Sequence, residues 1–396
     1  MKKLGMYIHI PFCVKKCLYC DFLSFENMGS DIHRQYIDAV NIELDFYSSV
    51  FGSNFIVDTI FFGGGTPSLI DANLIKEVLL FIKHKYRVQK DAEITIECNP
   101  KTIDAEKLEI YKQAGINRLS IGVQTLNDMA LKRLGRVHQS KDAKETFALA
   151  RQAGFDNINM DLMFAIPEHT NEVWQETLQE AIRLNPEHIS FYSLQLEEGT
   201  KYFEMFQKGE LNMVSDKIDR DMYHGAAQLL KESGYNHYEI SNCAKPGFEC
   251  KHNLKYWSME DYLGIGLGAH SYMNGQRFSN TRDLKQYIQE LRADNLGVGE
   301  NADNLEAKRK WIEWQHTNTE RDNMVEFIIT GMRRVEGINL TEFERRFGKN
   351  LFDIYPEQEN LVKDYMEKGL LILENNRMRF TIEGVDVSNT VLAEFV

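Results

Sequence analysis

The feature that most constrains the fold is an alternation of short apolar runs with longer amphipathic stretches through the first half of the chain. The apolar runs predict six strands, at residues 7–10, 59–62, 94–97, 118–123, 158–163 and 188–194. The amphipathic stretches predict helices at residues 32–48, 73–85, 105–113, 128–135, 141–152 and 172–183. Such alternation favours a parallel sheet, and six units are fewer than the eight of a closed (β/α)₈ barrel. We therefore predict an α/β fold with an open, partial (β/α)₆ barrel whose loops after the strands carry the chemistry.

The second half of the chain predicts a different organisation. Residues 199–238 are predicted to be mostly helical, and residues 239–272 are rich in glycine, aromatic residues and histidine. A charged, irregular stretch at residues 295–320 predicts a boundary between a barrel domain with its extension (1–295) and a small domain (321–396). The small domain is predicted to hold helices and then a hairpin, at residues 323–334, 340–347, 357–368, 370–374 and 377–382. Asn375 and Asn376 suit the hairpin turn, and the arrangement is typical of a winged helix.

Charge and hydropathy restrict the partners. The 396 residues carry a net charge of −13 with no block of lysine or arginine, which opposes binding to nucleic acid or to anionic lipid. We therefore expect the winged-helix-like domain to pack or dock rather than to bind DNA. No apolar run approaches the ~20 residues of a membrane span, and the N-terminus lacks the apolar stretch of a signal peptide. The expectation is a cytoplasmic protein, in which six cysteines are too few for a disulfide scaffold.

Three of the cysteines, Cys13, Cys17 and Cys20, lie within eight residues in a C-x₃-C-x₂-C pattern. Thiolates this close together on a short loop can hold one iron–sulfur cube, because soft sulfur ligands suit such clusters. The next cysteine, Cys98, follows a different strand, so one iron would lack a protein ligand and could chelate the amino and carboxylate groups of S-adenosylmethionine (SAM). A zinc site or buried structural cysteines are the alternatives, but the spacing does not supply a fourth zinc ligand. The pattern favours a [4Fe–4S] cluster.

A glycine run follows the second predicted strand, in residues 61–67 (FFGGGTP). Glycine lets a backbone approach a ligand closely, so amide and carbonyl groups of this segment could hold the amino end of SAM. A tight turn without a ligand is the alternative. No Lys-Ser/Thr pair follows, which excludes a phosphate-binding P-loop. The position one unit after the cysteine loop favours the SAM site.

Polar side chains occur at the ends of later strands, where a purely apolar strand would have none. Glu97 ends the third strand, Gln124 follows the fourth, Arg136 lies in a subsequent loop and Asp161 lies in the fifth strand. Carboxylates can hold ribose hydroxyls, and a guanidinium can hold the carboxylate of SAM. Each residue alone could equally cap a strand or pair with a neighbour, but their occurrence in successive units favours a shared ligand.

The segment from Tyr7 through the three cysteines to Phe22 resembles radical SAM proteins of the oxygen-independent coproporphyrinogen III oxidase group. The resemblance covers nearly the whole chain, and the HemW family of haem chaperones is the closer match. It implies a radical SAM barrel that holds a [4Fe–4S] cluster on the three cysteines, with SAM as cofactor. It also implies that the SAM-binding positions are Tyr7, Tyr19, Gly64, Gly65, Thr66, Glu97, Gln124, Arg136 and Asp161.

Residues 252–257 have the sequence His-Asn-Leu-Lys-Tyr-Trp, which matches the HNxxYW motif of the HemW family. The motif is associated with haem in that family, and a neutral imidazole flanked by aromatic rings suits a haem ligand. The resemblance therefore implies that His252 contacts haem. Two alternatives stay open: a histidine satisfied by hydrogen bonds, and a metal site formed with Cys243 and Cys250.

Two departures separate the chain from the oxidases of this group. Phe22 occupies a position where the oxidases have a further cysteine, and Cys13 lies near the start of the chain without their long N-terminal extension. The resemblance therefore favours a chaperone that holds haem as cargo and transfers it to acceptor haemoproteins, with the cluster, SAM and an electron donor in a supporting role. Whether SAM is turned over stays open. The alternative is oxidation of coproporphyrinogen III, in which a 5′-deoxyadenosyl radical abstracts a propionate hydrogen. The oligomeric state stays open, with a homodimer among the options.

Overall fold

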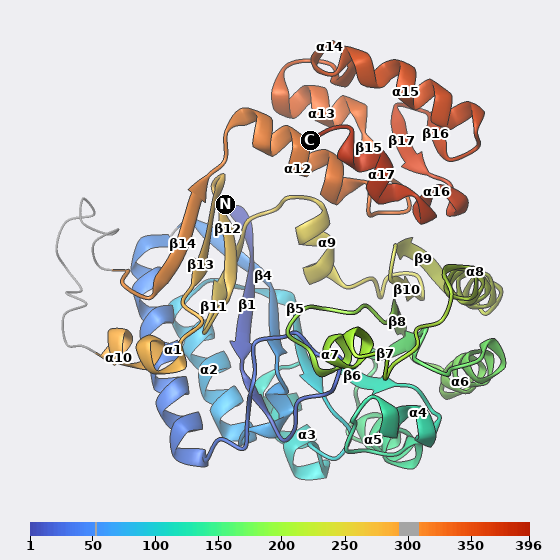
Figure 1. Cartoon of the computed structure of the whole chain (residues 1–396). Coiled ribbons are helices and arrows are strands. Elements are labelled where there is room, and N and C mark those ends of the chain that lie inside the picture. The colour runs from blue at the N-terminus through green and yellow to red at the C-terminus, as the bar shows by residue number, and fades with distance from the viewer. Residues whose placement is uncertain (52–53, 293–308) are drawn as a thin grey trace.

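The computed structural model describes residues 1–51, 54–292 and 309–396 (Figure 1). Six parallel strands lie side by side in the order β1-β4-β5-β6-β7-β8, within a sheet of twelve strands. Their bounds are β1 (Lys2–Ile10), β4 (Phe55–Gly64), β5 (Val88–Cys98), β6 (Arg118–Gln124), β7 (Ile158–Phe164) and β8 (His188–Ser193). Each lies where the sequence predicts a strand, so the partial (β/α)₆ barrel is confirmed.

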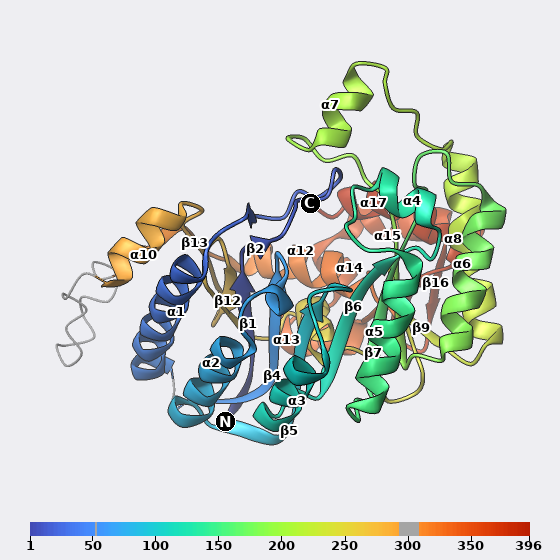
Figure 2. The ribbon, with the colours of Figure 1, turned by 90° about the horizontal axis from the view of Figure 1, so that it is seen from below.

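Helices follow the strands and lie in an arc outside them (Figure 2). Side chains of Asp71, Asp104 and Thr170 accept hydrogen bonds from backbone N–H groups at the starts of α2, α3 and α6, and thereby determine where these helices begin. The bounds are α1 (Ser30–Phe51), η1 (Pro67–Leu69), α2 (Ala72–Lys85), α3 (Ala105–Ala114), α4 (Asp128–Arg133), α5 (Ser140–Gln152), α6 (Asn171–Leu184), α7 (Lys201–Gln207) and α8 (Asp216–Glu232). In the part of the chain that the structure describes, no helix has the length and apolar character needed to cross a bilayer.

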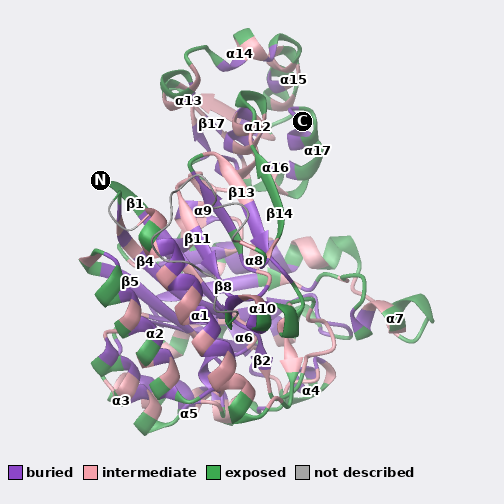
Figure 3. Ribbon diagram, turned by 90° about the vertical axis from the view of Figure 1, so that its left-hand side faces the viewer, coloured by how far each residue is buried: buried purple, intermediate pink, exposed green. Residues whose placement is uncertain are grey.

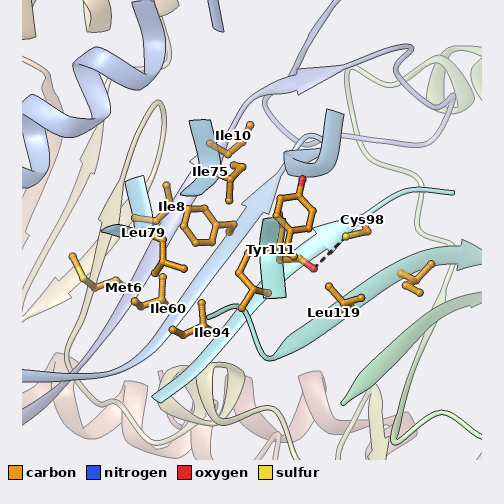
Figure 4. Packing of buried hydrophobic residues seen from close by; sticks show 14 of the residues in the cluster. Met6, Ile8, Ile10, Ile60, Ile75, Leu79, Ile94, Cys98, Tyr111 and Leu119 are labelled. Atoms are coloured by element: carbon orange, nitrogen blue, oxygen red, sulfur yellow. Dashed lines mark hydrogen bonds between the residues drawn. The ribbon is translucent and has the colours of Figure 1, made fainter. Parts of the chain in front are cut away.

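Side chains alternate along the six strands, and the alternation separates an apolar layer from a polar one. On β6, Leu119 and Ile121 are fully buried in the hydrophobic core, whereas Arg118 and Ser120 line a cavity. Figure 4 shows this apolar layer between the strands and the helices, with these side chains labelled: Met6, Ile8, Ile10, Ile60, Ile75, Leu79, Ile94, Cys98, Tyr111 and Leu119. The core therefore lies between the sheet and the helices, which leaves the inside of the barrel to polar side chains.

Both edges of the parallel sheet are extended by later strands. On one side, β11 (Tyr262–Ile265) lies parallel to β1 and is followed by the antiparallel strands β12 (His270–Met273), β13 (Gln276–Asn280) and β14 (Ile312–Thr317). On the other side, β10 (Asn242–Ala244) and β9 (Asn236–Glu239) extend the sheet beyond β8. Helix α10 (Leu284–Arg292) precedes β14 in the chain.

The expectation of an irregular stretch at residues 295–320 is wrong for the part that forms β14. This strand is the outermost of the sheet, and most of its side chains are exposed. Because exposed side chains can be polar, its sequence lacks the apolar pattern that identifies the other strands. Residues 295–308 of that stretch lie outside the described residues.

A second hydrophobic cluster forms the core of the C-terminal part of the chain. This part contains α12 (Glu320–Gly331), β15 (Ile338–Asn339), α13 (Leu340–Phe347), α14 (Leu351–Ile354), α15 (Pro356–Glu367), β16 (Leu371–Glu374), β17 (Arg377–Phe380), α16 (Ile382–Asp386) and α17 (Ser388–Ala393). Strands β16 and β17 form the predicted hairpin, and Asn375 and Asn376 adopt the positive φ angles of its turn. The winged-helix-like arrangement is confirmed. Figure 3 shows buried residues concentrated on the barrel strands and again inside these helices, and we propose that the two cores are two domains.

Candidate cluster and cofactor site

The three predicted cluster cysteines lie on one loop after β1, and short strands close its base. Strand β2 (Phe12–Cys13) begins the loop and pairs with β3 (Phe25–Glu26), which ends it. Backbone hydrogen bonds hold the middle of the loop from two sides. The N–H of Leu18 donates to the carbonyl of Leu134 at 3.1 Å, and the carbonyl of Leu18 accepts from the N–H of Tyr202 at 2.9 Å. The conformation of the loop is therefore determined by its contacts with the segments around α4 and α7.

The thiols of this loop are half-buried and carry no disulfide. Burial raises the pKa of Cys13, and it raises the pKa of Cys20 to about 11. Iron binds the thiolate form, so loading the site would release protons from these thiols. The Nη1 atom of Arg136 lies 3.5 Å from the Sγ atom of Cys17. This guanidinium places a positive charge beside the position that thiolate ligands would occupy.

The arrangement of sulfur atoms also bears on which metal the loop suits. Within residues 1–51, 54–292 and 309–396, no three His, Cys, Asp or Glu side chains form a site for a single metal ion. That finding covers the alternative ligands Cys243, Cys250 and His252 as well as the cysteine loop. Three thiols at the border of an open cavity fit the larger [4Fe–4S] cube, which needs ligands spread around it.

The glycine turn after β4 lies directly against the cysteine loop. The N–H of Gly65 donates to the carbonyl of Ile10 at 2.9 Å, and the N–H of Thr66 donates to the carbonyl of Phe12 at 2.8 Å. A Cβ atom on Gly65 would lie 2.8 Å from both the backbone N and the backbone O of Phe12, so glycine is needed for the two segments to approach this closely. The Oγ1 atom of Thr66 lies 3.6 Å from the Sγ atom of Cys13. The turn therefore forms a wall of the cysteine site.

Two of the predicted polar residues, Glu97 and Asp161, are carboxyl groups inside the barrel. Glu97 Oε2 accepts a hydrogen bond from the N–H of Gly64 at 3.1 Å. Asp161 accepts from the hydroxyl of Ser120 at 3.1 Å and from the side-chain amide of Asn159 at 2.8 Å. Burial and the nearby charge of Asp161 raise the pKa of Glu97 to about 8, and burial raises the pKa of Asp161. Near neutral pH, this pair of carboxyls therefore retains a proton.

The predicted guanidinium, that of Arg136, is oriented by two acceptors. Its Nη2 atom donates to the carbonyl of Gly122 at 2.7 Å and also to the side-chain oxygen of Asn99. The amide of Asn99 in turn donates to Thr66 Oγ1 at 2.8 Å, which links the guanidinium to the glycine turn. Asn99 is not among the residues predicted from the sequence. Its position two residues after Glu97, in the loop after β5, is the signal that could have identified it.

A variant tests the proton on this carboxyl pair. The free energy of unfolding of the unmodified chain, relative to Glu97→Gln, should fall as the pH rises from about 4.5 to about 8. The pKa of Glu97 is higher in the folded chain, about 8, than its ordinary value of 4.5, so the proton stabilises the folded state fully below 4.5 and this stabilisation is lost through pH 8. Chemical denaturation at about pH 5 and about pH 9 measures the difference, with Glu106→Gln on the exposed face of α3 as control. If the difference in free energy of unfolding between the unmodified chain and Glu97→Gln does not change with pH, Glu97 does not carry the proton.

One cavity of about 350 Å³ brings most of the predicted site residues together, and its size suits a small cofactor. Its lining includes Cys13, Cys17, Cys20, Tyr19, Gly64, Gly65, Thr66, Glu97, Gln124, Arg136 and Asp161. The lining also includes residues that the sequence analysis did not select, among them Asn99, Ser120 and Tyr192. Tyr192 lies near the end of β8, so a search for polar residues at every strand end would have found it.

Two predicted site residues, Tyr7 and His252, line a second cavity of about 240 Å³ instead. The hydroxyl of Tyr7 lies 3.0 Å from Nδ1 of His9. The two cavities have four lining residues in common: Glu97, Ser120, Asp161 and Tyr192. They therefore meet at this part of the barrel, where Tyr7 lines the second cavity together with the predicted SAM-binding residues Glu97 and Asp161. The assignment of Tyr7 to the SAM site stays a prediction.

Helix α9 (Lys251–Trp257), which carries the HNxxYW motif, packs inside the barrel rather than on its surface. His252 is only 1% exposed, and its ring stacks on Phe61 with 5.2 Å between ring centroids. Both ring nitrogens are hydrogen-bonded, Nδ1 to the hydroxyl of Thr59 and Nε2 to the hydroxyl of Tyr256, each at 2.8 Å. Burial lowers the pKa of His252 to about 3, so the ring is neutral. In this arrangement both ring nitrogens of His252 are engaged with hydroxyl groups of the chain, and haem contact at His252 stays a prediction.

Helix α9 is fixed at both ends by other parts of the chain. At its start, the carboxylate of Glu93 accepts hydrogen bonds from the backbone N–H groups of Lys251 at 3.0 Å and His252 at 3.1 Å. At its end, the guanidinium of Arg333 lies 4.6 Å from the ring centroid of Trp257. Figure 1 shows α9 between the barrel strands and the C-terminal domain that supplies this arginine. The helix therefore closes the end of the second cavity and is covered by the C-terminal domain.

Comparisons with known proteins identify the class of protein. A family model described as the radical SAM superfamily matches residues 7–181, and one described as the HemN C-terminal domain matches residues 318–387. Among solved structures, coproporphyrinogen III oxidase (HemN) from Escherichia coli is similar over 100% of this chain and 90% of its own chain, with a TM-score of 0.83. The two sequences are 23% identical, so this likeness shows the fold alone. Fold and family together define a radical SAM protein, a class that implies a [4Fe–4S] cluster and SAM.

Relatives that match over nearly their full length identify the family. A protein named heme chaperone HemW from Bacillus subtilis (strain 168) is 35% identical over 391 residues, which cover 98% of each chain. One of the same name from Escherichia coli (strain K12) is 36% identical over 345 residues, which cover 86% of this chain and 85% of the relative. The chain belongs to the HemW family.

Proposed function

We propose that this chain is a haem chaperone that holds a [4Fe–4S] cluster and SAM in the first cavity, binds haem and transfers it to acceptor haemoproteins. One cavity is lined by the three thiols, the glycine turn and the polar strand ends, which supports the assignment of a cluster and SAM to it. Similarity over nearly the whole length to relatives named heme chaperone HemW supports haem as the cargo. This function also requires an electron donor for the cluster.

Different residues of the first cavity would hold the cluster and the different parts of SAM. Cys13, Cys17 and Cys20 would hold the cluster, which when bound supplies the electron for cleavage of SAM. Glu97 and Asp161 would hold the ribose hydroxyls, and Arg136 would hold the carboxylate of SAM. The backbone of residues 64–66 would hold the amino end, with Tyr19 and Gln124 in the same lining. Tyr7 lines the second cavity beside Glu97 and Asp161, and would contact SAM where the two cavities meet.

An anaerobic experiment distinguishes this function from coproporphyrinogen III oxidation. Reconstituted full-length protein is incubated with coproporphyrinogen III, SAM and a reductant, and separately loaded with haemin and mixed with apomyoglobin as a test acceptor. We expect no protoporphyrinogen IX in the first reaction and formation of holomyoglobin in the second. Turnover of the porphyrinogen without haem transfer would replace the proposed function with the oxidase reaction.

Haem binding also tests the position of His252. We propose that His252 positions α9 and does not bind iron. Haemin added to the protein should give a Soret band from about one haem per chain, and His252→Ala should leave the position of that band unchanged. The same variant should unfold more easily, by roughly 1–3 kcal/mol, because it loses two buried hydrogen bonds and leaves the hydroxyls of Thr59 and Tyr256 unpaired.

The control for this experiment is His84→Ala, because His84 is an exposed histidine near the end of α2. It should change neither the Soret band nor the stability. A Soret shift that appears with His252→Ala alone would show that α9 opens and that His252 is the ligand.

A further inference from the structure

Arg118 is a buried cation that faces the second cavity without a partner. Its side chain comes from the first residue of β6, is 2% exposed and lines the cavity. The Nε atom is buried and has no hydrogen-bond partner among the residues that the structure describes, although Cys250, Glu93, Tyr238 and Asp161 lie close enough to act on the charge of the guanidinium. Burial of a guanidinium is costly unless acceptor oxygens surround it. The Nε–H group of Arg118 therefore lacks an acceptor among the described residues, and the guanidinium lines a cavity that could hold one.

Three carboxyls of the barrel whose charges act on Arg118 also accept hydrogen bonds from other donors. Glu93 accepts from two backbone N–H groups of α9. Asp161 accepts from a hydroxyl on β6 and an amide on β7, and Glu97 accepts from the glycine turn. These contacts orient the carboxyls toward their own donors. The cavity itself is the space in which an acceptor for Arg118 would lie.

The rest of the lining is mostly polar. It includes the hydroxyls of Ser190, Tyr192 and Tyr256, the amide of Asn253 and the ring of Phe61, together with the carboxyls of Glu97 and Asp161 on the side shared with the first cavity. Among the described lining residues, Arg118 is the only cation at neutral pH, since burial keeps His252 uncharged. A volume of about 240 Å³ accommodates several non-hydrogen atoms but not a whole tetrapyrrole.

We propose that the second cavity is a carboxylate-binding site in which Arg118 holds the carboxylate through its planar fork of N–H groups. The carboxylate could belong to a free small acid or to a side arm of a larger ligand that enters where the two cavities meet. Haem carries two propionate arms, so the second source alone rests on the proposed function. The first source does not rest on that function, because Arg118 lines the second cavity alone and lies outside the cysteine loop and the glycine turn.

The first test compares propionate with propionamide, which has nearly the same shape and no charge. The reconstituted full-length chain should show a melting temperature that rises with propionate but not with propionamide. Arg118→Met should weaken propionate binding at least about tenfold, and Arg118→Lys should weaken it as well because lysine keeps the charge without the fork. Arg183→Met, on the exposed side of α6, is the control and should respond to propionate like the unmodified chain.

A second variant and a second ligand complete the test. If Arg118→Met does not fold, as judged by circular dichroism, Asn253→Leu replaces it, because this change on α9 fills the cavity without removing the cation. Haemin and its dimethyl ester distinguish the two sources of the carboxylate. If the unmodified chain binds the ester more weakly than haemin, and Arg118→Met binds the two equally, the carboxylate is a propionate arm of haem. If the unmodified chain binds both equally, the carboxylate belongs to a free small acid. The proposal would be overturned if propionate and propionamide changed the melting temperature equally, and if neither esterification of haemin nor Arg118→Met changed the affinity for haem.

Discussion

A chain in which Cys13, Cys17 and Cys20 are all replaced by alanine should lose nearly all of its bound iron and sulfide. The unmodified chain, reconstituted anaerobically, is expected to hold about four iron and four sulfide per chain. The reason is the geometry of the loop, in which three thiols lie at the border of one cavity. Iron and sulfide assays on the purified proteins measure the loss.

The matched control removes the same number of thiols from elsewhere in the chain. Cys98, Cys243 and Cys250 are buried, and replacing all three by alanine should leave the iron content unchanged. The cluster variant should keep its fold, because the loop is positioned by the backbone hydrogen bonds of Leu18 and not by its sulfur atoms. Full iron content in the cluster variant, or loss of iron in the control, would contradict the assignment of the cluster to this loop.

The strands and helices of the barrel were predictable because one side of each strand is strongly apolar. Runs such as residues 94–97 and 158–163 contain isoleucine, leucine and methionine that pack against the outer helices, and this stripe marks the strand in the sequence. The same runs contain polar residues at alternate positions. The predicted site residues near the strand ends included Glu97 and Asp161 but not Arg118, which is the first residue of its strand and also lines a cavity.

The environment of His252 could not be predicted from its motif. A motif specifies the types of residue within a few positions, but the contacts of this histidine come from distant parts of the chain. Thr59 is 193 residues away from it, and the carboxylate of Glu93, which accepts from its backbone N–H, is 159 residues away. Whether an imidazole faces solvent or the barrel interior depends on where α9 packs. The polar edge strand β14 was missed for a related reason, since its strand character depends on pairing with β13.

Glu97 and Asp161 lie where the two cavities meet, and we expect them to contribute to the affinity for SAM. Asp161 lines both cavities and is held by hydrogen bonds from Ser120 and Asn159, which leaves the remaining acceptor capacity of its oxygens for a ligand. Glu97 lines the same two cavities and is tied to the glycine turn through Gly64. A ligand in the first cavity therefore meets carboxyl oxygens whose directions are already determined by the protein.

Asp161→Ala should accordingly weaken the binding of SAM by about one to two decades while the iron content stays normal. The loss of a hydrogen bond to a charged group costs roughly 1.5–3 kcal/mol, which corresponds to that change in affinity. Calorimetric titration of SAM into the cluster-loaded chain measures it, with Asp156→Ala, in the exposed turn before β7, as the matched control. Asp161→Asn keeps the shape and one acceptor oxygen, so it should lose less affinity than Asp161→Ala. If neither Asp161→Ala nor Glu97→Ala changes the affinity for SAM, the carboxyls serve only to hold the barrel interior together.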